Sequence, residues 1–278
     1  MRVTLITDKP DHPVLAAVTR ELATRHSVRT VDPGAIGTPW RSARREMSRD
    51  PQQVFLLKAH DAASREFAGC LQRLGALVIN DPVATSQCQD RLTMSRRLLA
   101  SALPCPPTVA VGSLFALLGR GASHRFEFPI VVKSRWSRRG DLVKRIDRQV
   151  ELEALSSVWM REPVVIQPYA ANDGWDRKVW VVDDQIFAAR RPTPLEGPGG
   201  GATIPIASAE VPAAWRHAAL AVGRAFGLRL YGLDLVIGPT GPLVVDVNAF
   251  PGYRGVHGAI AALVTFAEGL VPAERATA

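Results

Sequence analysis

The sequence lacks any long hydrophobic run. No apolar stretch among its 278 residues approaches the roughly 20 residues that a membrane-spanning helix needs. The first residues, MRVTLITDKPDH, turn polar too early for a secretory signal peptide. Hydrophobic residues still make up 47% of the chain, which is enough for a sizeable core. We therefore expect a soluble cytoplasmic protein without a membrane partner.

Cysteine is scarce and widely spaced. The three cysteines, Cys70, Cys88 and Cys105, form no CxxC pair and no cluster with histidine. An odd number of scattered thiols argues against a disulfide framework and gives no zinc-binding pattern. Internal repeats and low-complexity tracts are also missing, which excludes a solenoid or a repeat array.

Acidic residues are in the minority. Lys and Arg number 34 against 26 Asp and Glu, which gives a net charge of +8. Such a charge can attract nucleic acid, an anionic surface or a polyanionic small molecule. Many arginines fall on expected helices such as RSARREMSR, where a solvated helix face accounts for them. Helix-turn-helix, zinc-finger and aromatic RNA-binding signatures are missing, so we expect no nucleic-acid partner.

Residues 1–103 alternate between strands and helices. The apolar strands RVTLITD, HSVRTVD, QVFLLKA and ALVIN are separated by helical stretches such as DAASREFAGCLQRLG. This alternation predicts an α/β domain with a small parallel sheet. A helical stretch near residues 89–102 follows, and then Pro104, Pro106 and Pro107 mark a joint between domains.

Beyond this joint the pattern changes to hairpins. Residues 104–170 contain the strands FPIVVKS, GDLVKRI and VVIQPYA. Residues 171–278 contain two hairpins, DRKVWVVDDQIFAARRP and YGLDLVIGPTGPLVVDVN, together with helices at AAWRHAALAVGRAFG and near residues 257–269. The pattern predicts a mainly antiparallel α+β unit. The polar, glycine-rich residues 192–203 are expected to form a loop that closes over substrate.

The last hairpin carries acidic side chains in an apolar setting. Asp246 and Asn248 are two residues apart, so their side chains share a face of the strand. A three-residue turn at Pro239-Thr240-Gly241 would place Asp234 opposite Asp246 on that face. Carboxylate and amide oxygens of this kind suit Mg²⁺, which also takes waters and substrate phosphates. Taken alone, the three side chains fit polar hairpin residues facing solvent slightly better, and it is the neighbouring residues that favour the metal site.

Several polar residues end or interrupt apolar strands. Lys133 ends FPIVVK beside the basic loop SRWSRRG, where it could hold phosphate oxygens. The loop matches neither a P-loop nor a Rossmann fingerprint, and a snorkelling lysine would look the same. Gln167 and Tyr169 end another strand, whose backbone could serve an adenine edge or simply be a sheet edge. Lys178 lies in an apolar strand and needs either an acidic partner or an anionic ligand.

Together these segments resemble the ATP-grasp superfamily. The ending DVNAFPGYRGV, with its Asn-x-x-Pro-Gly pattern, is the most specific segment, and the match covers nearly the whole chain. The resemblance implies an N-terminal α/β domain (1–103), a central lid (104–170) and a C-terminal antiparallel-sheet domain (171–278). It implies an enzyme that uses ATP with Mg²⁺ or Mn²⁺. The metal ligands it implies are Asp234, Asp246 and Asn248.

One branch that the chain resembles is the inositol polyphosphate kinases of the inositol trisphosphate 5/6-kinase type. CQDRLTMSRRLL, VVKSRWSRRG, QPYAANDGWDRK and RRPTP are similar to nucleotide-binding and lid segments of that branch. The implied ATP-binding residues are Arg91, Lys133, Gln167, Tyr169, Lys178 and Thr193. The implied substrate-binding residues are Lys9, Lys58, Lys178, Asn248, Gly252 and Arg254. One departure is that the hinge histidine of this branch falls near Asn172 here.

The second branch is the RimK-type glutamate ligases, which join a carboxylate to an amine. GWDRKVWVVDDQIFAARR resembles their Gly-x-Asp-x-Arg hairpin. Their downstream Ser-Asn and paired glycines are not visible, because residues 192–203 read PTPLEGPGGGAT. That absence favours the kinase-like hypothesis. A ligase acting through an acyl phosphate is the alternative, and a non-catalytic ATP-binding module is a minor one.

Both branches imply the same first step. Lys133 and Arg91 neutralise the phosphates of ATP while an acceptor oxygen attacks the γ-phosphorus. We assign catalytic roles to Lys133, Lys178 and Arg254. The favoured acceptor is a small anionic, inositol-phosphate-like molecule, and the ligase alternative instead takes carboxylate and amine substrates. We expect a monomer or a small homo-oligomer.

Overall fold

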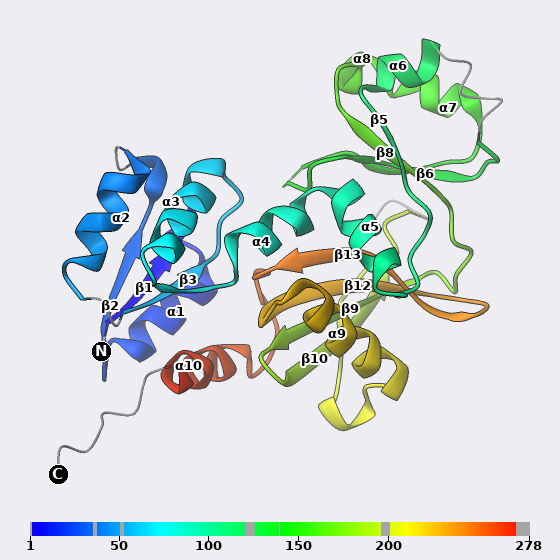
Figure 1. Cartoon of the computed structure of the whole chain (residues 1–278). Coiled ribbons are helices and arrows are strands. Elements are labelled where there is room, and N and C mark those ends of the chain that lie inside the picture. Colours follow the sequence, from blue (N-terminus) through cyan, green and yellow to red (C-terminus); the bar gives the residue numbers. More distant parts are fainter. Residues whose placement is uncertain are drawn as a thin grey trace.

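The computed structural model describes residues 2–35, 38–50, 53–119, 126–138, 140–195 and 201–270. These residues form three separate sheets, each with its own helices (Figure 1). The N-terminal sheet lies on one side, a four-stranded antiparallel sheet lies at the top of the other side, and a five-stranded antiparallel sheet lies beneath it. Each sheet falls inside one of the three ranges predicted as domains, although the limits at residues 103 and 170 themselves stay a prediction.

The N-terminal sheet is entirely parallel and has the order β2-β1-β3-β4, as the strand–helix alternation predicts. Its strands are β1 (Arg2–Ile6), β2 (Ser27–Val31), β3 (Val54–Leu57) and β4 (Leu77–Ile79). Its helices are α1 (Pro13–Leu22), η1 (Pro33–Ala35), α2 (Pro39–Met47) and α3 (Ala62–Arg73). Helix α3 begins where the carboxylate of Asp61 accepts a hydrogen bond from the Ser64 N–H.

Two helices lead from this sheet to the rest of the chain. They are α4 (Pro82–Gln89) and α5 (Arg91–Ala100), where the sequence predicts one helical stretch. The break falls at Asp90, whose side chain caps α5 by accepting from the Leu92 N–H at 3.1 Å. The same carboxylate accepts two hydrogen bonds from Arg135, at 2.9 and 2.7 Å. Asp90 therefore ties the helix joint to the loop that follows β6.

The upper sheet has the order β5-β8-β6-β7 and is antiparallel throughout. Its strands are β5 (Val109–Val111), β6 (Ile130–Ser134), β7 (Val143–Ile146) and β8 (Val164–Pro168). The pairing of GDLVKRI with FPIVVKS is confirmed as β6–β7. The short helices α6 (Leu114–Gly119), α7 (Gln149–Ala154) and α8 (Ser156–Trp159) complete this unit. None of these helices was predicted from the sequence, and neither was β5.

The lower sheet has the order β11-β10-β9-β12-β13. Its strands are β9 (Trp175–Val182), β10 (Gln185–Pro192), β11 (Ile204–Ile206), β12 (Leu230–Gly238) and β13 (Gly241–Ala249). Helices α9 (Ala213–Phe226) and α5 pack on one face, with η3 (Ser208–Glu210) preceding α9. Helix α10 (Ala259–Gly269) packs instead with α1 and the N-terminal sheet, so the two ends of the chain share one core.

The last hairpin reaches the predicted arrangement by a different route. Its register pairs Gly238 with Gly241, so the turn has two residues and the predicted three-residue turn is wrong. The register then shifts between Asp234 and Leu235, which leaves Val245 as an extra residue in β13. This bulge restores the predicted pairing of Asp234 with Asp246. Because side chains alternate between the two faces of a strand, the two-residue turn alone would pair Asp234 with Val245. The one extra residue of the bulge moves the register back by one position, so that Asp234 pairs with Asp246.

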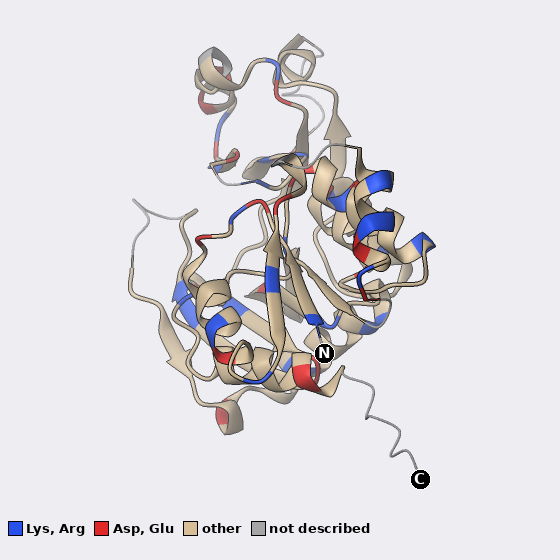
Figure 2. Cartoon of the chain, turned by 90° about the vertical axis from the view of Figure 1, so that its left-hand side faces the viewer, with Lys and Arg blue, Asp and Glu red and all other residues tan. Residues whose placement is uncertain are grey.

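Charged residues are spread over the molecule. Figure 2 shows Lys and Arg on helices and strands of both the upper lobe and the larger lower part, interspersed with Asp and Glu. Cys70, Cys88 and Cys105 are all buried free thiols. Within the described ranges, no helix combines the length and apolar character needed to cross a membrane.

Candidate functional site

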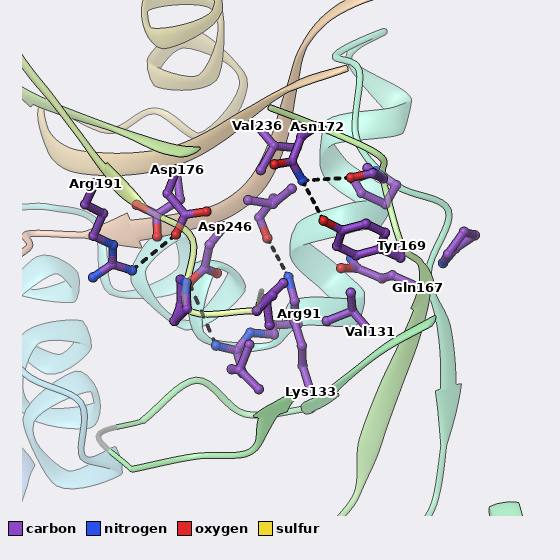
Figure 3. Close-up of a pocket in the computed structure, with 18 residues that line it drawn as sticks. Arg91, Val131, Lys133, Gln167, Tyr169, Asn172, Asp176, Arg191, Val236 and Asp246 are labelled. Atoms are coloured by element: carbon purple, nitrogen blue, oxygen red, sulfur yellow. Dashed lines mark hydrogen bonds and ion pairs between the residues drawn. The ribbon is translucent and has the colours of Figure 1, made fainter. Parts of the chain in front are cut away.

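A cavity of about 260 Å³ lies between the upper and lower sheets. One side of it is lined by uncharged residues that include Val131, Tyr169 and Val236, and the opposite side carries Asp176, Arg191 and Asp246 (Figure 3). Such a division suits a ligand with a flat apolar part and a charged part.

Two basic side chains reach into this cavity. Lys133 on β6 is buried and donates to the carbonyl oxygen of Val245 at 3.0 Å. That carbonyl belongs to the bulge residue of β13. Burial lowers the pKa of Lys133 to about 8, against the opposing effect of nearby Asp246. Arg91, the first residue of α5, donates to Asp141 at 2.6 Å and lies 3.8 Å from Asp246. Lys133 and Arg91 are therefore placed together, as the sequence predicts.

The two predicted metal-binding acids differ in their surroundings. One oxygen of Asp246, Oδ1, is buried and has no hydrogen-bond partner among the described residues. Both oxygens of Asp234 accept from Lys178 Nζ, at 2.7 and 2.6 Å. An unpartnered buried carboxylate oxygen is costly and fits a cation bound beside it.

Asn248 stands apart from the main cavity. It lies on the same face as Asp246 but lines a small neighbouring hollow with Gln89 and Ser137. Among the described residues, no group of three or more His, Cys, Asp and Glu side chains could hold a metal by itself. A cation here would therefore rely on two carboxylates, one amide, waters and ligand oxygens, as Mg²⁺ commonly does.

The residues predicted for adenine lie on the uncharged side. Gln167 and Tyr169 both line the cavity. However, the Tyr169 N–H donates to the Pro129 carbonyl at 3.0 Å, and the Gln167 amide donates to Thr108. Thr193 is buried but does not line the cavity, whereas its neighbours Pro194 and Leu195 do. Of the predicted loop 192–203, residues 196–200 lie outside the described part of the chain.

An ion pair that we did not predict also lines the cavity. Asp176 on β9 and Arg191 on β10 lie 3.3 Å apart and are directly opposite in the register. This pairing could have been predicted from the sequence, because a two-residue turn at Asp183-Asp184 sets Asp176 opposite Arg191.

A larger groove of about 1030 Å³ lies farther along the same face of the lower sheet. Lys178 stands at its border with the cavity, and Trp180, Phe187 and Pro205 line it beyond this point. Its other wall is the loop of residues 254–258. Lys178 thus lies between the cavity and an apolar groove instead of facing a cluster of lysines.

A third hollow of about 200 Å³ lies between the N-terminal sheet and the loop after β13. It brings together Lys9, Lys58 and Arg254, as predicted, and adds His12. Lys58 donates to the Phe250 carbonyl at 2.8 Å, and burial lowers the pKa of Lys58 to about 8. Gly252 also borders this place, since a Cβ atom there would lie 3.2 Å from His12 Nε2.

His12 is a neighbour of these cations that sequence reasoning missed. Its Nε2 accepts from Arg254 Nε at 3.3 Å, and its buried Nδ1 has no partner in the portion of the chain that the structure describes. Burial first, and then the charges of Lys58, Arg254 and Lys9, lower the pKa of His12 to about 4. No local pattern marks this residue, because the contact joins positions 242 apart in the chain.

The sequence of the chain matches a known protein family. Residues 119–264, more than half of the chain, match the model of the RimK-like ATP-grasp domain. A probable alpha-L-glutamate ligase from Pseudoalteromonas translucida (strain TAC 125) is 28% identical over 228 residues, covering 72% of each protein.

Solved structures show the same fold. A RimK domain ATP-grasp protein from Sphaerobacter thermophilus DSM 20745 matches with a TM-score of 0.73 and 20% identity, over 98% of this chain and 100% of that one. The D-alanine–D-alanine ligase of Bacillus anthracis matches with a TM-score of 0.70 and 17% identity, over 98% and 96%. The expected ATP-grasp fold is confirmed, whereas the resemblance to inositol polyphosphate kinases receives no support. The chain belongs to the RimK-like ATP-grasp family and is an ATP-grasp enzyme.

Proposed function

We propose that the protein is an ATP-dependent carboxylate–amine ligase that works through an acyl phosphate. The observation that carries this proposal is the position of the Lys178–Asp234 pair between the charged cavity and an apolar groove. A phosphorylated ring, the acceptor in the kinase hypothesis, would need polar and basic side chains at this border, because burying unpaired charge against an apolar surface is costly. The similarity to glutamate ligases supports the same conclusion.

The cavity between the sheets would hold ATP. Val131 and Val236 offer apolar contacts for the base, while Lys133 and Arg91 would neutralise the phosphates. Asp234, Asp246 and Asn248 would hold Mg²⁺ or Mn²⁺, which when bound neutralises charge on the terminal phosphates. The unpartnered Oδ1 of Asp246 is the feature of this chain that best fits that role.

The chemistry divides into two displacements. First, an oxygen of the donor carboxylate attacks the γ-phosphorus, and the bond to the leaving ADP breaks. Second, the amine attacks the acyl carbon, inorganic phosphate leaves, and the amine nitrogen loses a proton. The Lys178 ammonium, which is held against Asp234, would stabilise the negative charge that develops during the first displacement.

A phosphotransferase is the second candidate. The cluster of Lys9, Lys58 and Arg254 is the observation that favours it, because these cations could hold an anionic acceptor. A non-catalytic module would not need the buried charges of Lys133 and Asp246 at the same cavity, since each is costly to maintain.

The test combines product analysis with phosphate release. The protein is incubated with Mg-ATP and pairs of amino acids, and products are identified by mass spectrometry while inorganic phosphate is measured. The proposal predicts an amide product and one free phosphate for each ATP consumed. A phosphorylated organic product with no free phosphate would establish the phosphotransferase instead. ATP binding without turnover across amino acids and inositol phosphates would leave only a binding module.

A further inference from the structure

On the face of the lower sheet that borders the cavity, residues paired by register form rows that run across the strands. One row runs through Asp246, Asp234, Lys178, Ala189 and Pro205, each paired with the next by register. The charged cavity lies on one side of this row. The row on its other side runs through Asn248, Gly232, Trp180 and Phe187. The face therefore changes within one row from carboxylates and a lysine to two aromatic side chains.

The groove beyond Lys178 is built for an apolar occupant. Trp180 and Phe187 are half-buried on its floor, and Val256 lies on the loop that forms the opposite wall. Gly258, on the same loop, lies so close that a Cβ atom there would meet the Phe187 ring at 3.4 Å. Small-molecule sites combine such apolar linings with a few polar groups that fix orientation.

The groove ends at a group of cations. Arg254 lines both the groove and the neighbouring hollow that contains Lys9 and Lys58. Among the described residues that line this hollow, Asp8 is the one carboxylate. The hollow therefore carries an excess of positive charge, which is complementary to a single anionic group.

A buried donor in the hollow also lacks a partner. His12 is 8% exposed, and its Nδ1 makes no hydrogen bond within the described part of the chain. Since Nε2 accepts from Arg254, the neutral ring carries its proton on Nδ1. A ligand oxygen would reach this buried N–H only if the side chains around His12 shift, so the charge of the hollow, and not His12, carries the expectation of a bound anion.

We infer that the amine substrate is an amino acid with a large apolar side chain, whose carboxylate binds at Lys58 and Arg254 and whose side chain lies in the groove against Trp180 and Phe187. This inference rests on the proposed ligase function and adds the class of its amine substrate. It differs from a glutamate acceptor, because the two cations among the described lining residues are already engaged, Lys178 by Asp234 and Arg254 by the proposed α-carboxylate, while the floor between them offers Trp180 and Phe187.

Binding experiments test this inference without requiring turnover. Phenylalanine, tryptophan and glutamate, each as both enantiomers, are titrated by calorimetry into the protein held with Mg²⁺ and a non-hydrolysable ATP analogue. We expect phenylalanine or tryptophan to bind about tenfold or more tightly than glutamate. Tighter binding of glutamate, or of inositol hexakisphosphate, would overturn the inference.

Two variants separate the carboxylate contact from the groove. Arg254→Met should weaken phenylalanine about tenfold but leave 2-phenylethylamine, which has no carboxylate, unchanged. Val256→Glu should weaken both ligands, because it places a charge in the groove. Val83→Glu, at an exposed site on α4 that lines none of these cavities, is the matched control. Equal effects of Arg254→Met on both ligands would contradict the proposed orientation.

The inference and the proposed function can fail separately. If amides form but glutamate or another polar amine is preferred, the ligase function stands and the inference is wrong. If phenylalanine binds as expected but no amide forms with any donor, the substrate site stands and the ligase function is wrong.

Discussion

Lys178 on β9 donates to both carboxylate oxygens of Asp234 on β12, at 2.7 and 2.6 Å. The pair is part-buried and occupies the row that divides the charged cavity from the apolar groove. From the sequence, Lys178 needed either an acidic partner or an anionic ligand. In the structure its partner is Asp234, which is itself a predicted metal ligand. Its ammonium restrains Asp234, and in the proposed reaction it would also stabilise negative charge that develops on the transferring phosphoryl group.

Replacing Lys178 with Met should separate these two roles. We expect kcat to fall about 100-fold or more, because a charge aimed at the transition state is lost. The KM for ATP should change little, since Lys133 and Arg91 remain. Direct titration of Mg²⁺ should also show tighter binding, because Asp234 loses its counter-charge. Lys178→Arg keeps the charge and serves as the comparison; an unchanged kcat in Lys178→Met would contradict the role.

Asp246→Asn tests the metal assignment. The substitution keeps the shape of the side chain but removes the charge beside Lys133 and Arg91. We expect turnover to fall at least about 100-fold and the Mg²⁺ dependence of nucleotide binding to weaken. Asp183→Asn, in the exposed turn between β9 and β10, is a control of the same chemistry. Full activity of Asp246→Asn with unaltered Mg²⁺ dependence would remove Asp246 from the metal site.

The pH dependence of substrate binding should report Lys58. Burial lowers the pKa of Lys58 to about 8, and the groups facing it are Asp8, Lys9, His12, His60 and Arg254. In the proposed binding mode the charged form of Lys58 holds the substrate carboxylate, so this part of the affinity is present below the pKa of Lys58 and is lost as the pH rises through it. At saturating ATP, the KM for the amine substrate should rise as the pH passes about 8 and level off where Arg254 alone holds the carboxylate.

Lys58→Arg is the matched variant for this pH profile. An arginine stays protonated across the accessible range, so the KM should remain flat where that of the native protein rises. A profile that rises equally in both proteins would assign the titration to another group. Saturating ATP keeps Lys133, whose pKa is also about 8, from entering the measured KM.

Asp90 should stabilise the joint between α4, α5 and the loop after β6. Asp90→Ala removes the cap of α5 and both hydrogen bonds to Arg135. We expect a loss of about 1–3 kcal/mol in the free energy of unfolding, measured by urea denaturation. Asp61→Ala removes a cap without an arginine partner and should cost less. Equal losses in the two variants would show that Arg135 contributes nothing.

The same contact predicts a dependence on acid. Burial acts to raise the pKa of Asp90, but hydrogen bonds from Arg135 and Thr93 outweigh it and lower the pKa. A carboxylate with a lowered pKa stabilises the fold above its unfolded pKa, and this contribution disappears as the pH falls below about 4. The difference in stability between native protein and Asp90→Ala should therefore shrink in acid; a constant difference would argue against the ion pair.

Local patterns in the sequence predicted the strands other than β5 and β11, the hairpins and the pairing of Asp234 with Asp246. The predicted turn was wrong, because no local signal revealed the bulge at Val245 that restores this pairing. The opposition of Asp176 and Arg191 was available from the turn at Asp183-Asp184 and was missed. The contact of His12 with Arg254 was beyond reach, since it depends on how the N-terminal sheet meets the loop after β13.

Net charge alone does not identify the substrate. The value of +8 favoured a polyanion, yet the charges are spread over the molecule and the surface next to Lys178 is apolar. A sum over the chain does not show which charges converge. The groove depends on β11, a three-residue strand that was not predicted, and on residues 254–258 folding back towards it.

The most direct test of the ligase proposal follows the oxygen atoms. Amino acids labelled with oxygen-18 in their carboxylates are supplied with Mg-ATP, and the released inorganic phosphate is analysed by mass spectrometry. An acyl phosphate transfers one carboxylate oxygen to phosphorus, so we predict one oxygen-18 atom in each phosphate formed with an amide. Unlabelled phosphate, or phosphate retained on an organic product, would contradict the proposal.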